Sequence, residues 1–151
     1  MALLAKGTWV VLVDGEKALI CENTGTQRAP RLRLHAKMAQ ELEPNREMAT
    51  DRPGRMPDNG RNQRSAMEET DFNRQAKERF VAEVAARVNR LAGKTEIGRM
   101  VVAAPPQLLS VLRDELDEGL RGRVIAELPK TLTQHPLSAL GARVAALVDP
   151  I

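Results

Sequence analysis

The sequence predicts a mixed α/β fold, in which a five-stranded sheet has helices on its faces. Two apolar runs, residues 8–14 and 17–23, are separated by a short Gly-containing connection, as in a β-hairpin. Residues 31–38 alternate apolar and polar side chains, which is typical of a strand with one buried face. The rest of the chain alternates helical periodicity with short β-rich runs. This order predicts an antiparallel meander followed by parallel βαβ units.

The alternation in 31–38 also predicts which side chains of this third strand are buried. Leu32, Leu34 and Ala36 are expected to face the core. The same pattern places His35 on the solvated face, together with the basic side chains of this strand. A lone histidine there lacks the further ligands that a metal site requires.

A long polar segment, residues 44–71, separates the third strand from the first helix. Its prolines and glycines, Pro53, Gly54, Pro57 and Gly60, predict that it forms neither a helix nor a central strand. A loop of this length is usually either a working loop or a disordered connection, and both interpretations stay open. Arginines can make bidentate phosphate contacts, and glycines let a backbone approach a ligand closely. The candidate RNA-binding residues are the arginines Arg52, Arg55, Arg61 and Arg64, with Gln63 beside them.

The remaining elements follow from periodicity and from helix-start and helix-stop residues. The first helix is expected to begin at Thr70 or Asp71, to run to Ala92 and to end at Gly93. The later elements are predicted as a strand over 97–104, a helix from Pro106 to Leu116 closed by Gly119, a strand over 123–128 and a helix from Pro136 to Leu147. The order β-β-β-loop-α-β-α-β-α is related in outline to the ribonuclease H-like layout. At 151 residues, the chain is expected to form a single domain, 1–151.

Composition limits the possible partners. The net charge of +3 permits phosphate contact without requiring it. The only aromatic residues are Trp9, Phe72 and Phe80, too few for the stacking platforms of sequence-specific single-strand readers. No apolar run is long enough to span a bilayer, and the start of the chain does not resemble a signal peptide, so a cytoplasmic location without membrane partners is expected. The lone Cys21 lies in an apolar run and is expected to be a buried thiol.

Tests for common chemistries give no catalytic residue. Asp14 ends the first strand, where a two-metal nuclease would hold a carboxylate, but the fourth strand ends in Ala-Ala-Pro and supplies no second acid. Pro105 and Pro106 have no N–H with which to hold a phosphate at the following helix. The two histidines have no evident nucleophile or metal partner. We therefore predict no metal and no cofactor, and we favour a protein that is not an enzyme.

Several short motifs together resemble one bacterial family. They are Trp9 at the start of the first strand, Asp14-Gly15, Asp51-Arg52-Pro53-Gly54-Arg55, Ala104-Pro105-Pro106, and the stretch from Glu127 to Thr133. The chain thereby resembles the proteins called "protein required for attachment to host cells", with a departure at Thr131, where that pattern has aspartate. That family is similar in fold to the middle domain of archaeal and eukaryotic class-1 peptide release factors. The resemblance implies that the loop 44–71 occupies the position of the ribosome-facing loop of those factors.

The resemblance leads to three hypotheses about function. In release factors this loop carries Gly-Gly-Gln, whereas the nearest stretch here is Asn59-Gly60-Arg61-Asn62-Gln63, so peptidyl-tRNA hydrolysis is the least favoured hypothesis. The leading hypothesis is a binding protein that contacts the ribosome, rRNA or tRNA through the loop arginines. The alternative is a cytosolic adaptor that binds a protein partner and influences surface attachment indirectly.

Overall fold

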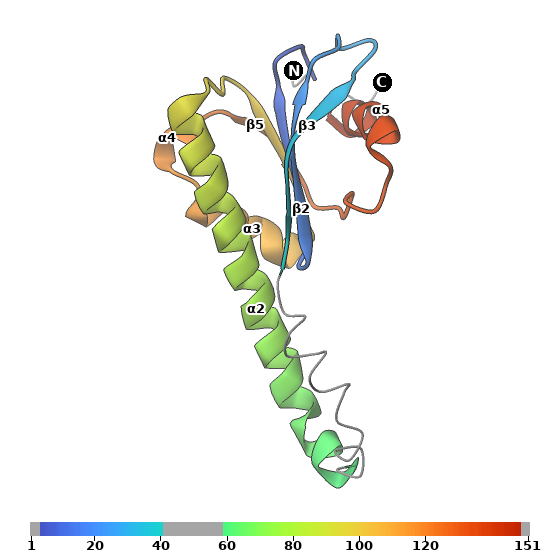
Figure 1. Ribbon diagram of the computed structural model, residues 1–151, viewed down its shortest axis with the longest axis vertical. Helices are drawn as coiled ribbons and strands as arrows, with labels where there is room; N and C mark the ends of the chain where they lie inside the picture. Colours follow the sequence, from blue (N-terminus) through green and yellow to red (C-terminus); the bar gives the residue numbers. More distant parts are fainter. Residues whose placement is uncertain (1–3, 41–58, 149–151) are drawn as a thin grey trace.

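The structure of the protein, a computed structural model, describes residues 4–40 and 59–148, except for the side chains of residues 59–72. Its centre is a five-stranded sheet in the order β3-β2-β1-β4-β5, seen edge-on in Figure 1. The strands are β1 (Trp9–Val13), β2 (Lys17–Asn23), β3 (Leu32–Ala39), β4 (Met100–Ala103) and β5 (Val124–Leu128). The helices are α2 (Asn59–Lys94), α3 (Pro106–Glu115), α4 (Glu118–Arg121) and α5 (Leu137–Val148). The predicted mixed α/β class is confirmed.

The strand pairing also follows the prediction. β1 and β2 form the antiparallel hairpin, and β3 continues it as an antiparallel neighbour of β2. β4 pairs parallel with β1, and β5 pairs parallel with β4. The chain therefore builds outward from β1 in both directions, and the sheet has a topological switch point between β1 and β4.

Each face of the sheet has its own core, because successive side chains of a strand point to opposite faces. Figure 1 shows α2 and α3 on one face and α5 on the other. The core beneath α2 and α3 contains the fully buried Trp9, Phe80 and Leu112. The core beneath α5 contains Leu12 and Leu140. The strands thus read as nearly continuous apolar runs, as the sequence indicates for β1, because both faces are covered.

A β-bulge in β3 changes the side-chain pattern predicted for this strand. Leu34 lies opposite Cys21, but the next paired residue is Ala36, opposite Ile20, so that His35 is an extra residue. Leu34 shares the α5 face with Cys21 and is 38% exposed, whereas Ala36 packs against the core beneath α2. The prediction that Leu34 and Ala36 share one buried face is therefore wrong, because the extra residue reverses the alternation between them.

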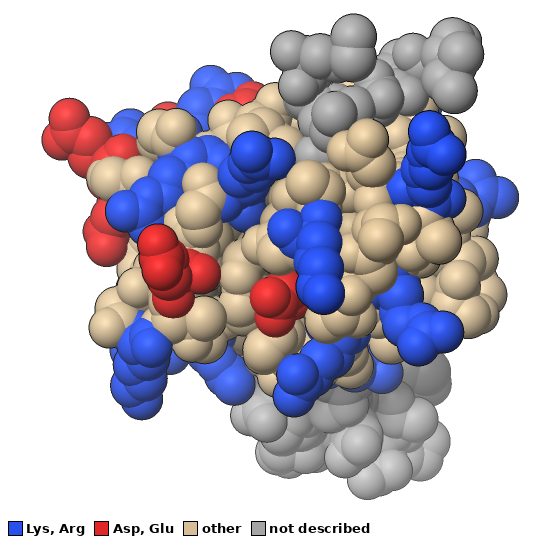
Figure 2. Space-filling view, turned by 90° about the horizontal axis from the view of Figure 1, so that it is seen from above, with Lys and Arg blue, Asp and Glu red and all other residues tan. Residues whose placement is uncertain are grey.

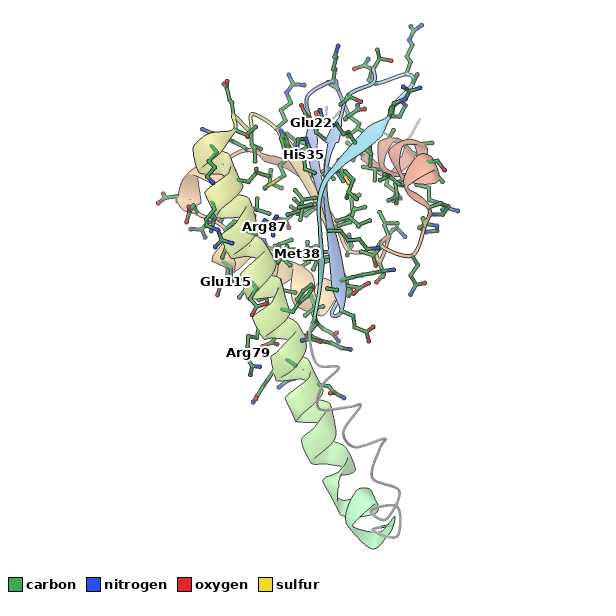
Figure 3. The ribbon with its side chains drawn as sticks, viewed as in Figure 1. Glu22, His35, Met38, Arg79, Arg87 and Glu115 are labelled. Carbon is green, nitrogen blue, oxygen red and sulfur yellow. The ribbon has the colours of Figure 1, made fainter. Side chains whose placement is uncertain are left out.

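The bulge also gives His35 different neighbours from those predicted. Its ring centroid lies 4.4 Å from that of the buried Trp9, and its Nε2 lies 3.1 Å from Oε1 of Glu22 (Figure 3). The side chain of His35 is 26% exposed. His35 is exposed, as the sequence predicts, but its closest partners are the indole of Trp9 and the carboxylate of Glu22 rather than the neighbouring cations.

The first helix begins much earlier than predicted. α2 runs from Asn59 to Lys94, so residues 59–71 are helical and the loop prediction is wrong for them. After Gly60, this stretch is rich in arginine, glutamine, alanine, methionine and glutamate, which have good helix propensity. Gly60 lies in the first turn, where backbone N–H groups lack helical partners in any case. The later part of α2 packs on the sheet and is therefore already helical, so adding residues 59–71 to it requires no new helix nucleation. The rest of the predicted loop, residues 44–58, lies outside the described residues.

Two glycines do not end helices as predicted. Gly93 lies inside α2, which ends one residue later and is closed by a hydrogen bond from Thr95 N–H to Leu91 O (2.8 Å). Gly119 lies inside α4, a short helix that the sequence pattern does not reveal. The other predicted elements are confirmed with shifted ends. The largest shift is the start of β4 at Met100.

Candidate functional site

The N-terminal part of α2 projects from the sheet. In the part of α2 whose side chains are described, the buried residues begin at Ala76. Nε2 of Gln40, just after β3, donates a hydrogen bond to the carbonyl of Ala76 at 2.7 Å, which fixes the helix to the sheet at this point. From Asn59 to Ala76 the helix rises about 26 Å at about 1.5 Å per residue. Figure 1 shows this part of α2 extending past the end of the sheet.

The predicted RNA-binding residues fall on this projecting end or outside the described residues. Arg52 and Arg55 lie outside the described residues. Arg61, Gln63 and Arg64 lie in the first two turns of α2, where the structure describes the backbone as helical. Positions 61 and 64 are three residues apart and therefore lie on the same side of the helix backbone. The helix brings these two positions together, which a loop would not ensure.

A pocket of about 730 Å³ lies at the carboxyl ends of β1 and β4, the switch point of the sheet. Open α/β sheets commonly bind ligands at this position. The pocket is bounded by the β1–β2 turn, α2, the start of α3 and the segment after β5. Its lining includes Asp14, Lys77, Glu78, Gln107, Thr131 and Gln134. The lining mixes both signs of charge with amide and hydroxyl groups, so it does not favour a strongly anionic ligand.

The carboxylate of Asp14 is occupied by hydrogen bonds within the protein. Oδ1 accepts from the backbone N–H of Glu16 (2.6 Å) and of Lys17 (2.8 Å), and Oδ2 accepts from the hydroxyl of Thr133. This arrangement closes the β1–β2 turn and joins it to the segment after β5. Among the residues that the structure describes, no group of three or more His, Cys, Asp or Glu side chains could hold a metal ion. Asp14 therefore orders the pocket wall.

The β1–β2 turn packs directly on α2. A Cβ added to Gly15 would lie 2.4 Å from Cγ of Lys77, so only glycine leaves room for the aliphatic part of this lysine. On the other side of the pocket, α3 begins with Pro106 and has no side-chain cap. Neither Pro105 nor Pro106 offers an N–H to an anion at this turn. The pocket is therefore not built as a phosphate cradle.

Sequence reasoning missed most of the pocket, because its residues come from four separate segments. The sequence indicates Asp14 as a strand-end carboxylate, and Gly15 and Thr131 only as parts of short motifs. Lys77 and Gln134 carry no local signal of their own. The one signal that points to them is the strand order, since a switch point between β1 and β4 predicts a crevice at the ends of those strands.

Cys21 is the buried thiol that the sequence predicts. Its side chain is fully buried, and burial raises the pKa of the thiol to about 11. A thiol in this state is a poor nucleophile at neutral pH, because little thiolate is present. In residues 4–40 and 59–148, no helix is long and apolar enough to cross a membrane.

Taken together, the mixed sheet and the long projecting helix define an α/β domain whose first helix extends beyond the sheet. A family described as bacterial archaeo-eukaryotic release factor family 12 matches residues 7–144, and the chain belongs to this family.

Among solved structures, the chain is similar to the crystal structure of an archaeal translation termination factor, aRF1. The TM-score is 0.51 at 13% sequence identity, over 93% of this chain and 33% of that one. At this identity the likeness shows the fold alone, and the chain spans about a third of the length of that factor. No curated protein matches the sequence. The predicted likeness to release factors is thereby confirmed, whereas the comparisons give no support to the host-attachment designation.

Proposed function

We propose that this protein is a translation-related binding protein that contacts the ribosome or its RNA through residues 44–71. Family membership supports a role in translation. The observation that carries the proposal is the projection of α2, which presents the N-terminal end of the helix beyond the sheet. A projecting helix end can reach into a crevice of a large partner without a clash from the sheet. Such a role places the protein in the cytoplasm.

The arginines of this segment suit RNA. Its arginines gather between positions 52 and 64, where Asp58 is the only acidic residue. The proposed contacts are made by Arg52, Arg55, Arg61, Gln63 and Arg64. Arginine pairs well with phosphate, because its planar guanidinium can donate two parallel hydrogen bonds.

Binding is favoured over peptidyl-tRNA hydrolysis for two reasons. The stretch nearest to Gly-Gly-Gln is Asn59-Gly60-Arg61-Asn62-Gln63, which lacks the second glycine beside glutamine. These residues also form the first turn and a half of α2, so their backbone is helical and directed along the helix axis. A helical glutamine lacks the freedom that glycines would give the backbone beside it.

Co-sedimentation with ribosomes tests this proposal. The wild-type protein is expected in the ribosomal fractions at low salt and to leave them as salt rises, because counterions compete for phosphate. Replacement of Arg52, Arg55, Arg61 and Arg64 by alanine is expected to lower the affinity at least about tenfold. A control with the same loss of charge replaces the exposed Arg79, Arg87, Arg90 and Arg143 by alanine. We expect this control to sediment like the wild type.

Two outcomes would contradict the proposal. Wild-type protein that stays out of the ribosomal fractions at low salt would exclude stable ribosome binding. Equal losses in the variant that lacks Arg52, Arg55, Arg61 and Arg64 and in its control would show a general effect of charge. Affinity capture that yields a protein partner and no ribosomal component would favour the adaptor hypothesis instead.

A further inference from the structure

Basic side chains gather at the end of the sheet opposite to the projecting end of α2. β1, β4 and β5 are mutually parallel, and β3 has the same direction because two antiparallel pairings separate it from β1. The amino ends of these four strands therefore share one edge, which the C-terminal end of α2 also reaches. We call this surface the amino edge. Its basic residues are Lys6, Arg28, Arg31, Arg33, Lys94, Arg99, Arg121 and Arg123.

Backbone hydrogen bonds order the arginines of the amino edge along the sheet. The carbonyl of Arg99 accepts from Trp9 N–H (2.9 Å), which places Arg99 beside the start of β1. The carbonyl of Arg123 accepts from Met100 N–H (2.9 Å), which places Arg123 beside the start of β4. With Arg33 on β3, the row crosses the whole sheet. Four interstrand spacings of about 4.8 Å give it a length of roughly 19 Å.

A buried asparagine holds the two segments of the amino edge that lie outside the strands, namely the segment before β1 and the β2–β3 turn. Asn23 is fully buried at the end of β2, and its Nδ2 donates to the carbonyls of Leu4 (2.9 Å) and Ala5 (3.3 Å). Its Oδ1 accepts from the backbone N–H of Gly25 (3.0 Å) and Arg31 (2.9 Å). One side chain thus holds both the N-terminal segment before β1 and the β2–β3 turn. The basic residues of these two segments are carried on an ordered backbone.

The amino edge has a clear positive surplus. All eight basic residues are exposed, and none is within ion-pair distance of a carboxylate among the described residues. The acidic residues near them are Glu22, Glu96, Asp117 and Glu118, and Glu22 is hydrogen-bonded to His35. The surplus of positive charge among these described residues, eight cations against four anions, is larger than the net charge of +3 of the whole chain. Figure 2 looks onto this end and shows blue side chains distributed over it and outnumbering red ones.

We propose that the amino edge binds the phosphate backbone of double-helical RNA, as a second RNA contact at the far end of the molecule. The inference extends the proposed function and rests on RNA being the partner. Six of the eight basic residues are arginines, which suit phosphate. Trp9 is 1% exposed, so its indole offers bases no stacking platform. Contact with the backbone of a duplex requires no such platform.

A membrane surface fits the amino edge less well. Proteins that lie on a membrane usually insert large apolar side chains beside the basic ones. Among the described residues, the exposed large apolar side chains are Leu34 and Leu137, of which Leu34 alone adjoins the basic row, next to Arg33. The length of α2 separates the two RNA contacts by about 54 Å at about 1.5 Å per residue. The protein would therefore touch two distant sites of a structured RNA.

Binding of a short labelled RNA duplex, without ribosomes, tests the inference. The edge variant replaces Arg28, Arg99 and Arg121 by alanine, because these side chains are exposed and the structure shows no polar contact for them. We expect at least an approximately tenfold loss of affinity at about 0.1 M salt, and a fall of about 2.7 in the slope of log affinity against log salt. The matched control replaces Arg79, Arg87 and Arg143, which are also exposed but lie within α2 and α5 rather than at the amino ends of the strands. This control is expected to keep the wild-type slope.

The outcomes separate this inference from the proposed function. If the edge variant binds the duplex like the wild type, or if the wild type does not bind it at all, the inference is overturned, whatever the ribosome sedimentation shows. If edge and control variants lose affinity equally, the effect is general charge and the inference is also overturned. Binding to vesicles of anionic lipid that the edge variant loses, without duplex binding, would identify a membrane surface instead. An unchanged thermal unfolding curve shows that the edge variant is folded.

Discussion

The two ends of α2 present positive charge in different ways. At the amino edge, the cations come from several strands and turns and are positioned by the sheet and by Asn23. At the projecting end, the arginines come from one continuous segment, and residues 44–71 contain six acidic residues against five arginines. The net charge of that segment is therefore slightly negative, whereas the amino edge is clearly positive. Under the two proposals, long-range attraction to RNA is expected from the amino edge and local contacts are expected from the projecting end.

The largest expected effect comes from weakening the packing of α2 on the sheet, because this helix connects the projecting end to the amino edge. Phe80 is 2% exposed and lies in the core beneath α2. Phe80→Ala removes a large buried ring and leaves a cavity, which is expected to lower the free energy of unfolding by about 3–5 kcal/mol. Urea unfolding measures this loss. The neighbouring substitution Arg79→Ala changes an exposed side chain and should change stability by less than about 0.5 kcal/mol.

A loss below about 1 kcal/mol for Phe80→Ala would mean that α2 is not held by this core. The two ends would then be mechanically independent, and the comparison between them would lose its structural basis. If the full loss is found, both RNA contacts are expected to weaken together near the unfolding transition.

A smaller effect, confined to the amino edge, is expected for Asn23→Ala. The substitution leaves one buried carbonyl, one part-buried carbonyl and two backbone N–H groups without their partner, at an expected cost of about 3 kcal/mol. The segments that carry Lys6, Arg28 and Arg31 lose their common anchor. Duplex RNA binding should therefore weaken even under conditions in which the protein remains folded. Anisotropy with the labelled duplex, together with urea unfolding, measures both effects.

Asn89→Ala is the matched control for Asn23→Ala. The side chain of Asn89 also both donates and accepts. Its Nδ2 donates a hydrogen bond to the carbonyl of Glu115 (3.2 Å), and its Oδ1 accepts one from the backbone N–H of Asp117 (2.9 Å). These groups are exposed, so water can replace the side chain, and a cost of about 1 kcal/mol is expected. Equal effects of the two substitutions on RNA binding would show that Asn23 does not organise the amino edge.

The sequence predicts the apolar elements well and the polar features poorly. β1 and β2 are evident from their apolar runs and the Asp14-Gly15 turn, because burial on both faces leaves a strong local pattern. The bulge at His35 is hidden, because one inserted residue changes the pairing without changing composition. The start of α2 is also hidden, because the packing of distant residues supports the helix through a polar stretch.

The candidate sites are harder still to predict, since they depend on which segments meet. The amino edge gathers single basic residues from positions 6 to 123, and none of them stands out locally. Asn23 reads as an ordinary turn residue, although it is buried with four hydrogen bonds. Conversely, the arginines of 52–64 stand out because they are close in sequence. Sequence reasoning therefore favoured the projecting end and overlooked the opposite surface.

The smallest expected effect is the pH dependence of stability that the buried thiol of Cys21 causes. Burial raises the pKa of its thiol to about 11 from an ordinary value of 9.0. The folded protein thus retains a proton that the unfolded chain releases. Stability should therefore fall as pH rises from about 9 to about 11, by up to about 1.4 kcal/mol per pH unit. The pH dependence of urea unfolding, compared between the wild type and Cys21→Ala, isolates this contribution from that of the lysines.

The same thiol distinguishes local opening at the two ends. Cys21 lies two residues before Asn23, so loss of the Asn23 anchor should expose the thiol, whereas the projecting end of α2 is remote from it. At pH 8, alkylation by iodoacetamide is expected to be slow in the wild type, faster in Asn23→Ala, and unchanged when Arg61 and Arg64 are replaced by alanine. Equal alkylation rates in all three proteins would show that Asn23 does not hold the amino end of the sheet closed.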